Sequence, residues 1–177
     1  MAGPKTYGHA RVLCDLLRDR RYARGAEIGV NHGMTALYLL EHLPGIERYY
    51  AVDPWEADST YLETLSPEKR RTQAEFDAAY AGFLARILPY AGKVAVLRLD
   101  SLWAADAIPR WTLDWAFIDG VHTSTHCRCD IDDWVPKVVH GGLLAGHDYN
   151  MPGVRKAVDE RFRRVHVAPE NVWWVEV

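Results

Sequence analysis

Ala26-Glu27-Ile28-Gly29-Val30-Asn31-His32-Gly33 is the stretch of sequence that decides the fold. Residues 26–30 are short and mostly apolar, which predicts a buried strand, and the glycines that follow predict a tight turn. Residues 34–43 are good helix formers and stop at Pro44-Gly45, so a helix is expected after the turn. A strand, a glycine-containing loop and a helix in this order are typical of nucleotide-binding α/β domains.

The same alternation of strands and helices continues through most of the chain. Apolar strands are expected at residues 49–52, 94–99, 115–118 and 143–145, and amphipathic helices at 12–20, 76–87, 127–138 and from Pro152. Residues 165–168 and 172–177 are expected to close the fold as a hairpin. We therefore predict an α/β fold, a Rossmann-like doubly wound sheet of about seven strands, mostly parallel with an antiparallel C-terminal hairpin strand, and helices on both faces. Residues 1–177 are expected to be one domain, with residues 55–92 as a variable helical segment near the substrate.

Composition narrows the class of protein. The chain has 177 residues, of which 49% are hydrophobic and 25% charged, as in a globular protein, and its formal charge is −3. That charge gives no basic surface for nucleic acid or an anionic membrane. Three cysteines and no apolar N-terminal run favour a reducing compartment, so a cytoplasmic protein is expected. A small-molecule partner fits this composition, and a homo-oligomer stays open.

Four acidic residues follow the predicted strands. They are Asp53, Asp100, Asp119 and, slightly beyond its strand, Asp148. In open α/β sheets the carboxyl ends of parallel strands meet at one edge, and ligands bind in the crevice there. One such acid suits a turn or a helix cap, but four at the same edge indicate a site.

The loop and the first acid suggest the class of cofactor. A dinucleotide site favours G-x-G-x-x-G, whereas residues 29–33 have the form G-x-x-x-G. Asp53 lies 20 residues after Gly33, where a carboxylate can accept both hydroxyls of a ribose. Several nucleotide-binding families share this pair of features.

The order of elements and the motifs 27–33, 51–53, 99–101 and 117–120 resemble class I S-adenosylmethionine-dependent methyltransferases. The run Phe117-Ile118-Asp119-Gly120-Val121-His122, with Gly146-His147-Asp148-Tyr149, is similar to small-molecule O-methyltransferases of the macrocin type and to cephalosporin-hydroxylase-like proteins. The resemblance covers most of residues 24–177 but not residues 55–92.

The resemblance implies a role for each matching residue around S-adenosylmethionine. Glu27 and Gly29 shape the pocket for its methionine end, with Gly33 beneath it, and Asp53 holds the ribose. Asp100 accepts from the adenine amino group beside Ser101. Trp55 either covers the adenine ring or is a core aromatic residue. Asp119 completes the cofactor-binding set.

The resemblance also implies the chemistry of the transfer. Asp119 and His122 are the expected catalytic pair, with His122 as general base, because the ordinary pKa of histidine is near neutral. Asp119 and Asp148 are oxygen ligands suited to Mg²⁺. The adjacent Asp-Asn pair of catechol-type enzymes is absent, so metal dependence and the second ligand stay open. A zinc site at His126, Cys129 and Asp130, which share a helix face, is the weaker metal alternative, because Cys127 falls on the apolar stripe and no second ligand pair lies at zinc-finger spacing.

The sequence therefore predicts an S-adenosylmethionine-dependent methyltransferase, an enzyme that O-methylates a small sugar or aromatic acceptor, with or without Mg²⁺. Two alternatives stay open: a non-catalytic module that binds the cofactor, and an NAD(P)-dependent oxidoreductase of Rossmann type. The negative net charge of the chain disfavours RNA methylation as a third alternative.

Overall fold

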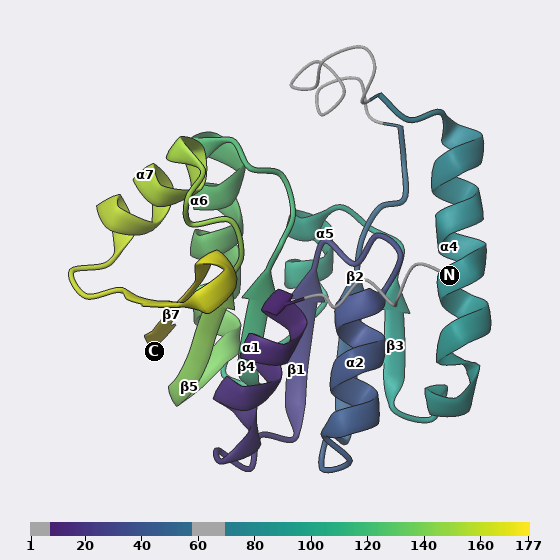
Figure 1. Ribbon diagram of the computed structural model, residues 1–177, viewed down its shortest axis with the longest axis horizontal. Helices are drawn as coiled ribbons and strands as arrows, with labels where there is room; N and C mark the ends of the chain where they lie inside the picture. The colour runs from purple at the N-terminus through teal and green to yellow at the C-terminus, as the bar shows by residue number, and fades with distance from the viewer. Residues whose placement is uncertain (1–7, 58–69) are drawn as a thin grey trace.

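The computed structural model describes residues 8–57 and 70–177 and forms a layered α/β structure (Figure 1). Its helices are α1 (Gly8–Arg18), α2 (Met34–His42), α4 (Gln73–Ile87), α5 (Ser101–Asp106), α6 (Ser124–Trp134) and α7 (Pro152–Arg161). Its strands are β1 (Arg24–Ile28), β2 (Arg48–Val52), β3 (Val94–Leu97), β4 (Leu113–Ile118), β5 (Val138–Gly146), β6 (His166–Ala168) and β7 (Val172–Glu176). Short 3-10 turns occur at Leu88–Tyr90, Val135–Lys137 and Pro169–Asn171.

The seven strands form one sheet in the order β3-β2-β1-β4-β5-β7-β6. The first five strands are parallel, whereas β7 runs antiparallel to both β5 and β6. The chain order reverses between β1 and β4, which is where open α/β sheets bind their ligands. The predicted fold class is confirmed, including the closing hairpin.

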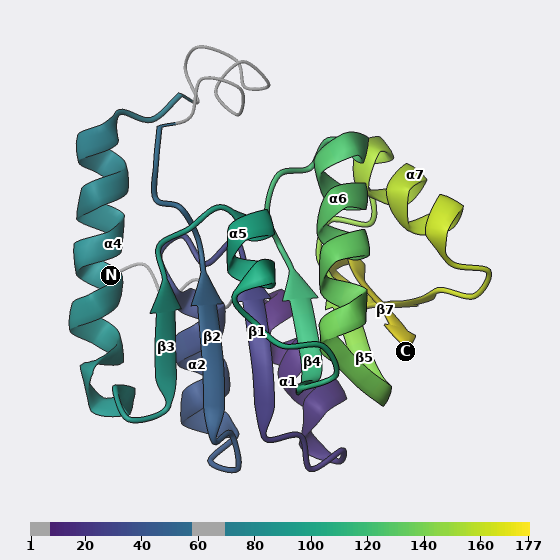
Figure 2. The same cartoon turned by 180° about the vertical axis from the view of Figure 1, so that it is seen from behind.

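Helices cover both faces of the sheet, and each face has its own apolar core (Figures 1 and 2). Leu13 of α1, Leu39 of α2 and Phe83 of α4 pack in one core, and all three side chains are fully buried. Ile131 of α6 and Val158 of α7 belong to the other core, also fully buried. Because both faces are covered, β4 is apolar almost throughout.

The largest difference from the predicted boundaries lies between α6 and β5. The expected helix over 127–138 ends at Trp134, because Pro136 and a 3-10 turn interrupt it, and Val138 already begins β5. Gly141 lies inside β5 with φ of 79°, a conformation that favours glycine. Helix α5 was not expected, and Asp100 begins it as the N-cap.

The segment between β2 and β3 is seen in part. Helix α4 starts at a capping box formed by Thr72 and Glu75, slightly before the predicted start. Residues 58–69 of the predicted variable segment lie outside the described residues. Across residues 8–57 and 70–177, every helix is too short or too polar to cross a bilayer.

Candidate active site

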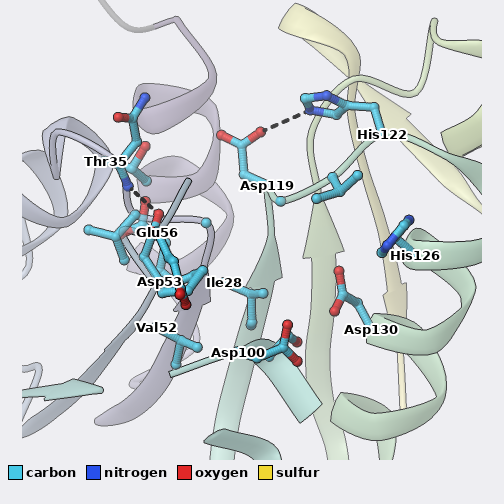
Figure 3. A pocket seen from close by; sticks show the side chains of 18 of the residues that line it. Ile28, Thr35, Val52, Asp53, Glu56, Asp100, Asp119, His122, His126 and Asp130 are labelled. Carbon is cyan, nitrogen blue, oxygen red and sulfur yellow. Dashed lines mark hydrogen bonds and ion pairs between the residues drawn. The ribbon is translucent and has the colours of Figure 1, made fainter. Parts of the chain in front are cut away.

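A cavity of about 430 Å³ opens at the carboxyl ends of the parallel strands. Its walls come from the loops after β1, β2, β3 and β4, the start of α2, His9 of α1 and one face of α6. Figure 3 shows Asp119 and His122 at one end of this space, and Asp100 and Asp130 at the other. Three of the four predicted strand-end acids, Asp53, Asp100 and Asp119, line the cavity, and Asp148 contacts His122 at its rim.

Asp53 stands where the sequence predicts the ribose acid, at the end of β2. Its Oδ2 accepts a hydrogen bond of 2.8 Å from the backbone of Asn31, and its Oδ1 accepts one of 2.7 Å from the backbone of Trp55. These bonds fix the carboxylate and join the β1 and β2 loops. Burial raises the pKa of Asp53, partly offset by those N–H groups and by Arg71 and Arg98. Each oxygen keeps lone pairs that can accept from a ligand hydroxyl.

Glu27 is a buried acid on the inner part of β1, with 1% of its surface exposed. The hydroxyl of Tyr49 donates a 2.5 Å hydrogen bond to its Oε2. Burial raises the pKa of Glu27 to about 8, against the lowering effect of that bond. A neutral acid facing a cavity beside the start of α2 can ionise when a cationic ligand group arrives, which suits an ammonium group.

The two glycines of the β1 loop have different roles. Gly29 lines the cavity, and a Cβ there would overlap the carbonyl group of Asp119. Gly33 does not line the cavity; it is the N-cap of α2 with φ of 71°, and its missing side chain makes room for Phe83. The structure thus gives Gly33 a packing role, and its expected place beneath the methionine end of the cofactor stays a prediction.

Trp55 also lies elsewhere than in the pocket. Its side chain is fully buried between Tyr80 and Phe83, and its Nε1 donates a 2.8 Å hydrogen bond to the carbonyl of Asn31. Trp55 is absent from the cavity wall, whereas Pro54 and Glu56 on either side line it. Of the two interpretations of Trp55, the core aromatic is the one that the structure shows.

The far end of the cavity combines α5 and α6. Asp100 caps α5 through a 3.0 Å hydrogen bond from the backbone of Leu102, and Ser101 accepts a 2.9 Å bond from Nε1 of Trp134. Asp130 of α6 completes this wall with 8% of its surface exposed. The sequence prediction considered Asp130 only in the weak zinc alternative with His126 and Cys129, although it sits at helical spacing from Cys127 and Trp134 on the apolar stripe.

The opposite end holds a cluster of two carboxylates and two histidines. Nε2 of His122 lies 2.8 Å from Oδ2 of Asp148 and 4.0 Å from Oδ1 of Asp119. Nδ1 of His147 lies 3.4 Å from each of those two carboxylates. The structure thus brings together the predicted catalytic pair and the predicted metal ligands, and it adds His147.

The charges of this cluster depend on one another. Contacts with Asp119 and Asp148 raise the pKa of His122 to about 9, in spite of its burial. Burial lowers the pKa of His147, but the same two carboxylates outweigh it and bring the value to about 10. The histidines in turn hold the pKa of Asp148 well below its usual range. Both imidazoles are therefore cationic at neutral pH as long as no added cation engages the two carboxylates.

His9 and Thr35 are site residues that the sequence prediction missed. Nε2 of His9 lies 3.1 Å from the Thr35 hydroxyl and 3.9 Å from Asp119, and its ring centroid lies 4.3 Å from that of His147, with the two rings tilted by 36°. Burial lowers the pKa of His9, so this imidazole is the neutral member of the group. Its position depends on α1 docking over the sheet, which no local pattern reveals.

Asp119, His122 and Asp148 can offer one ligand atom each within 4.8 Å of one another, close enough to hold a metal ion. Carboxylates suit Mg²⁺, and a third ligand from imidazole suits Mn²⁺ or Zn²⁺ better. His126, Cys129 and Asp130 share the cavity wall, but in the described part of the chain they do not meet as a metal-binding group. Cys127 is buried in the core, as the apolar stripe indicates.

The profile of a family described as a methyltransferase domain matches residues 26–149, well over half of the chain. The chain belongs to this methyltransferase family. The matched residues run from β1 to just beyond β5 and include every cluster described above except His9. The class I methyltransferase predicted from the motifs is confirmed. Among curated proteins, no match to this methyltransferase was found.

Solved structures agree on the fold of the methyltransferase. An O-methyltransferase from Bacillus cereus in complex with SAH is 15% identical, with a TM-score of 0.61, 100% of this chain covered and 84% of that one. TomG, an O-methyltransferase from Streptomyces achromogenes solved with SAM and involved in tomaymycin synthesis, is 14% identical, with a TM-score of 0.67 and coverages of 98% and 82%. A precorrin 8W decarboxylase from Methanobacterium thermoautotrophicum is 14% identical, with a TM-score of 0.65 and coverages of 99% and 92%. At these identities the likeness concerns the fold alone, so the reaction must be argued from the site.

Proposed function

We propose that this methyltransferase transfers the methyl group of S-adenosylmethionine to a hydroxyl group of a small molecule. One observation carries the proposal: Asp53 and the cluster of Asp119 and His122 face the same cavity. Methyl transfer from S-adenosylmethionine requires a carboxylate that binds the ribose and, in the same cavity, a group that takes the proton of the acceptor. The structural neighbours solved with SAM or SAH are O-methyltransferases, which supports the same cofactor and acceptor atom.

The loops after β1 and β2 would hold the two ends of the cofactor. Asp53 would bind its ribose, and Glu27 would bind its ammonium group and give up a proton as that group arrives. The first N–H groups of α2, at Met34 and Thr35 in the cavity wall, suit the carboxylate at this end. A cofactor held in this way would present its methyl group to the side of the cavity with Asp119 and His122, where alignment of the acceptor oxygen would account for much of the rate.

Removal of the acceptor proton is the second task of the site. At a pKa of about 9, His122 carries a proton at neutral pH, so it is not ready to act as a base while both carboxylates pair with it. The simple argument from the ordinary pKa of histidine therefore does not apply here. Engagement of Asp119 and Asp148 by another cation lowers the pKa of His122 and frees its imidazole to take the proton.

A divalent cation fits the residues that would perform this engagement. Asp119 and Asp148 would hold it, and when bound it lowers the pKa of a coordinated hydroxyl. His122 then remains beside the acceptor as the base instead of as a ligand. Metal use by these residues is part of the proposal, and the identity of the ion is for experiment.

The acceptor is placed over the rim of the cavity. Glu56, Arg71 and Phe76 belong to the predicted variable segment and line the cavity, which supports its expected position near the substrate. Histidines from three elements and the ring of Phe76 suit a polar ring such as a sugar or a phenol. TomG, a fold neighbour, is an O-methyltransferase involved in tomaymycin synthesis.

Calorimetry and a turnover assay test the proposal together. The wild type should bind S-adenosylhomocysteine in calorimetry. In the turnover assay it should convert S-adenosylmethionine to S-adenosylhomocysteine when a hydroxylated acceptor is present. Asp53→Ala should weaken cofactor binding by about 100-fold or more, because it removes hydrogen bonds to a charged acceptor. His122→Ala should keep cofactor binding and lose turnover. His42→Ala, an exposed histidine of α2 on the opposite edge of the sheet, is the matched control.

Each alternative predicts a different result in these assays. Tight cofactor binding by Asp53→Ala contradicts the ribose assignment. Cofactor binding by the wild type without turnover on any hydroxylated acceptor favours a non-catalytic module. Competition between NAD(P) and S-adenosylhomocysteine for the same cavity favours the oxidoreductase.

A further inference from the structure

The wall of the cavity farthest from His122 contains an acid that the proposed reaction does not use. Asp130 projects from α6 into this wall, where Asp100 and Ser101 also lie (Figure 3). Its side chain is nine-tenths buried, yet it borders a cavity instead of packing against an apolar core. A Cβ on Gly120 would lie 3.5 Å from Oδ2 of Asp130, which places this oxygen beside the loop after β4.

Ser101 is the neighbour that can orient Asp130. Nε1 of Trp134 donates to Oγ of Ser101 at 2.9 Å, and the Ser101 hydroxyl lies near enough to the carboxyl group of Asp130 to lower its pKa. Because Ser101 accepts from Trp134, its only hydrogen is left for another acceptor such as Asp130. We assign Ser101 as a positioning residue for the acid. A rigid polar group on a dry wall is the usual way a pocket selects one ligand.

The wall with Asp130 is the part of the cavity that we assign to the adenine ring of the cofactor. In the proposed function, on which this inference rests, Glu27 would hold the methionine end, Asp53 would hold the ribose, and the reacting end would face Asp119 and His122. The lining also includes Asp100, Ser101 and Leu102 on one side and His126, Cys129, Asp130 and Asp133 on the other. We assign this wall to the purine attached to the ribose, because Glu56, Arg71 and Phe76 are assigned to the acceptor.

We propose that Asp130 selects adenine as the base, accepting a hydrogen bond from the exocyclic amino group and donating one to the adjacent ring nitrogen. Adenine offers an amino donor beside a ring-nitrogen acceptor, and side chains that carry one donor and one acceptor, such as asparagine, bind that edge through two bonds. An unionised carboxyl group has the same pair of functions. Asp100 is free to accept from the second hydrogen of the amino group.

The charges around Asp130 favour the unionised form. Burial raises its pKa to about 7, partly opposed by the Ser101 hydroxyl. Asp100 at the start of α5 and Asp133 on α6 add negative charge that raises it further. His126 lies one turn earlier on α6 in the same wall, and Nδ1 of His126 lies 2.7 Å from the hydroxyl of Thr123.

Calorimetry with two ligands tests this assignment. The ligands are S-adenosylhomocysteine and its 6-deamino analogue, in which purine replaces adenine. The wild type should bind the adenine ligand about ten-fold or more tightly than the purine ligand, as one or two hydrogen bonds of about 1 kcal/mol each allow. Asp130→Ala should reduce that ratio to about two-fold or three-fold. Asp130→Asn should preserve the ratio, because asparagine keeps one donor and one acceptor.

Two further variants make the test specific. Asp132→Asn removes an exposed acid of the same helix, which pairs with Arg161, and should leave the ratio at its wild-type value. Ser101→Ala should lower the ratio without abolishing binding. The affinity of the wild type for S-adenosylhomocysteine, relative to that of Asp130→Asn, should fall as the pH rises from 6 to 8.5. The reason is that the ionised carboxylate has lost the proton that it would donate to the ring nitrogen.

An unchanged ratio in Asp130→Ala overturns the inference, and so does a wild-type affinity that stays constant relative to Asp130→Asn across this pH range. If the wild type binds neither ligand, the proposed cofactor itself is wrong. The two failures are therefore distinguishable, since the first leaves tight binding of S-adenosylhomocysteine intact.

Discussion

Replacing Glu27 with glutamine should stabilise the free protein at neutral pH and weaken its binding of the cofactor. Glu27 is fully buried in β1, and burial raises its pKa to about 8 from an ordinary value of 4.5. The folded chain therefore holds a proton that the unfolded chain releases above pH 4.5. An acid with a raised pKa in the folded state loses stability as the pH rises through this window.

The size of the effect follows from the two pKa values. Each pH unit between 4.5 and 7 costs about 1.4 kcal/mol, so the carboxyl group of Glu27 lowers the free energy of unfolding by about 3 kcal/mol at pH 7. Glutamine is neutral throughout and keeps an oxygen to accept from Tyr49. Glu27→Gln should therefore gain up to about 3 kcal/mol at pH 7 and almost nothing at pH 4.5.

Urea unfolding at several pH values measures this difference. The gain of Glu27→Gln over the wild type should grow steadily from pH 5 to pH 8. Glu41→Gln, an exposed acid of α2, should follow the wild type at every pH. A gain that does not change with pH, or a loss at pH 8, refutes the argument. Calorimetry in buffers of different ionisation enthalpy should also detect proton release when the wild type binds the cofactor, and none from Glu27→Gln.

Three other predictions concern packing and metal use. Trp55→Ala should lower the free energy of unfolding by about 3–5 kcal/mol, since it removes a fully buried indole; a loss below 1 kcal/mol in urea unfolding would contradict its core position. Gly33→Ala should destabilise the protein by more than about 1 kcal/mol, because Gly33 has a positive φ and an added Cβ would meet the Phe83 ring. Phe83→Leu in the same chain should recover part of this loss. Equal stability of Gly33→Ala and wild type would show that the turn is not constrained. Chelation should abolish methyl transfer, added Mg²⁺ or Mn²⁺ should restore it, and Asp148→Asn should need more metal; full activity after exhaustive chelation would remove the metal from the mechanism.

The sheet and its acidic edge were predictable from the sequence because their signals are local. Continuous apolar runs mark strands buried on both faces, and an acid just after a parallel strand reaches the ligand-binding edge wherever the strand sits in the order. Asp53 and Asp119 were therefore placed correctly without any knowledge of the strand order.

The remaining features depend on contacts between distant segments. Trp55 follows a strand end as a ligand-stacking residue would, and only the docking of α4 shows that Tyr80 and Phe83 enclose it. His9 reaches Asp119 through the packing of α1, more than 100 residues away in sequence. Asp130 did leave a signal, an acid on the apolar stripe of a helix, but only the structure shows that it is buried at the wall of the cavity.

Gly29 has a consequence for how this protein can change. Its Cα rests against the carbonyl group of Asp119, so the loop that holds the donor and the loop that carries the reactive acid touch without an intervening side chain. A shift of one loop must therefore move the other, so the distance between the bound methyl donor and the acceptor would stay fixed when the surrounding sequence changes. Variation in acceptor choice should therefore accumulate around Glu56, Arg71 and Phe76, where the wall can be rebuilt without disturbing that spacing.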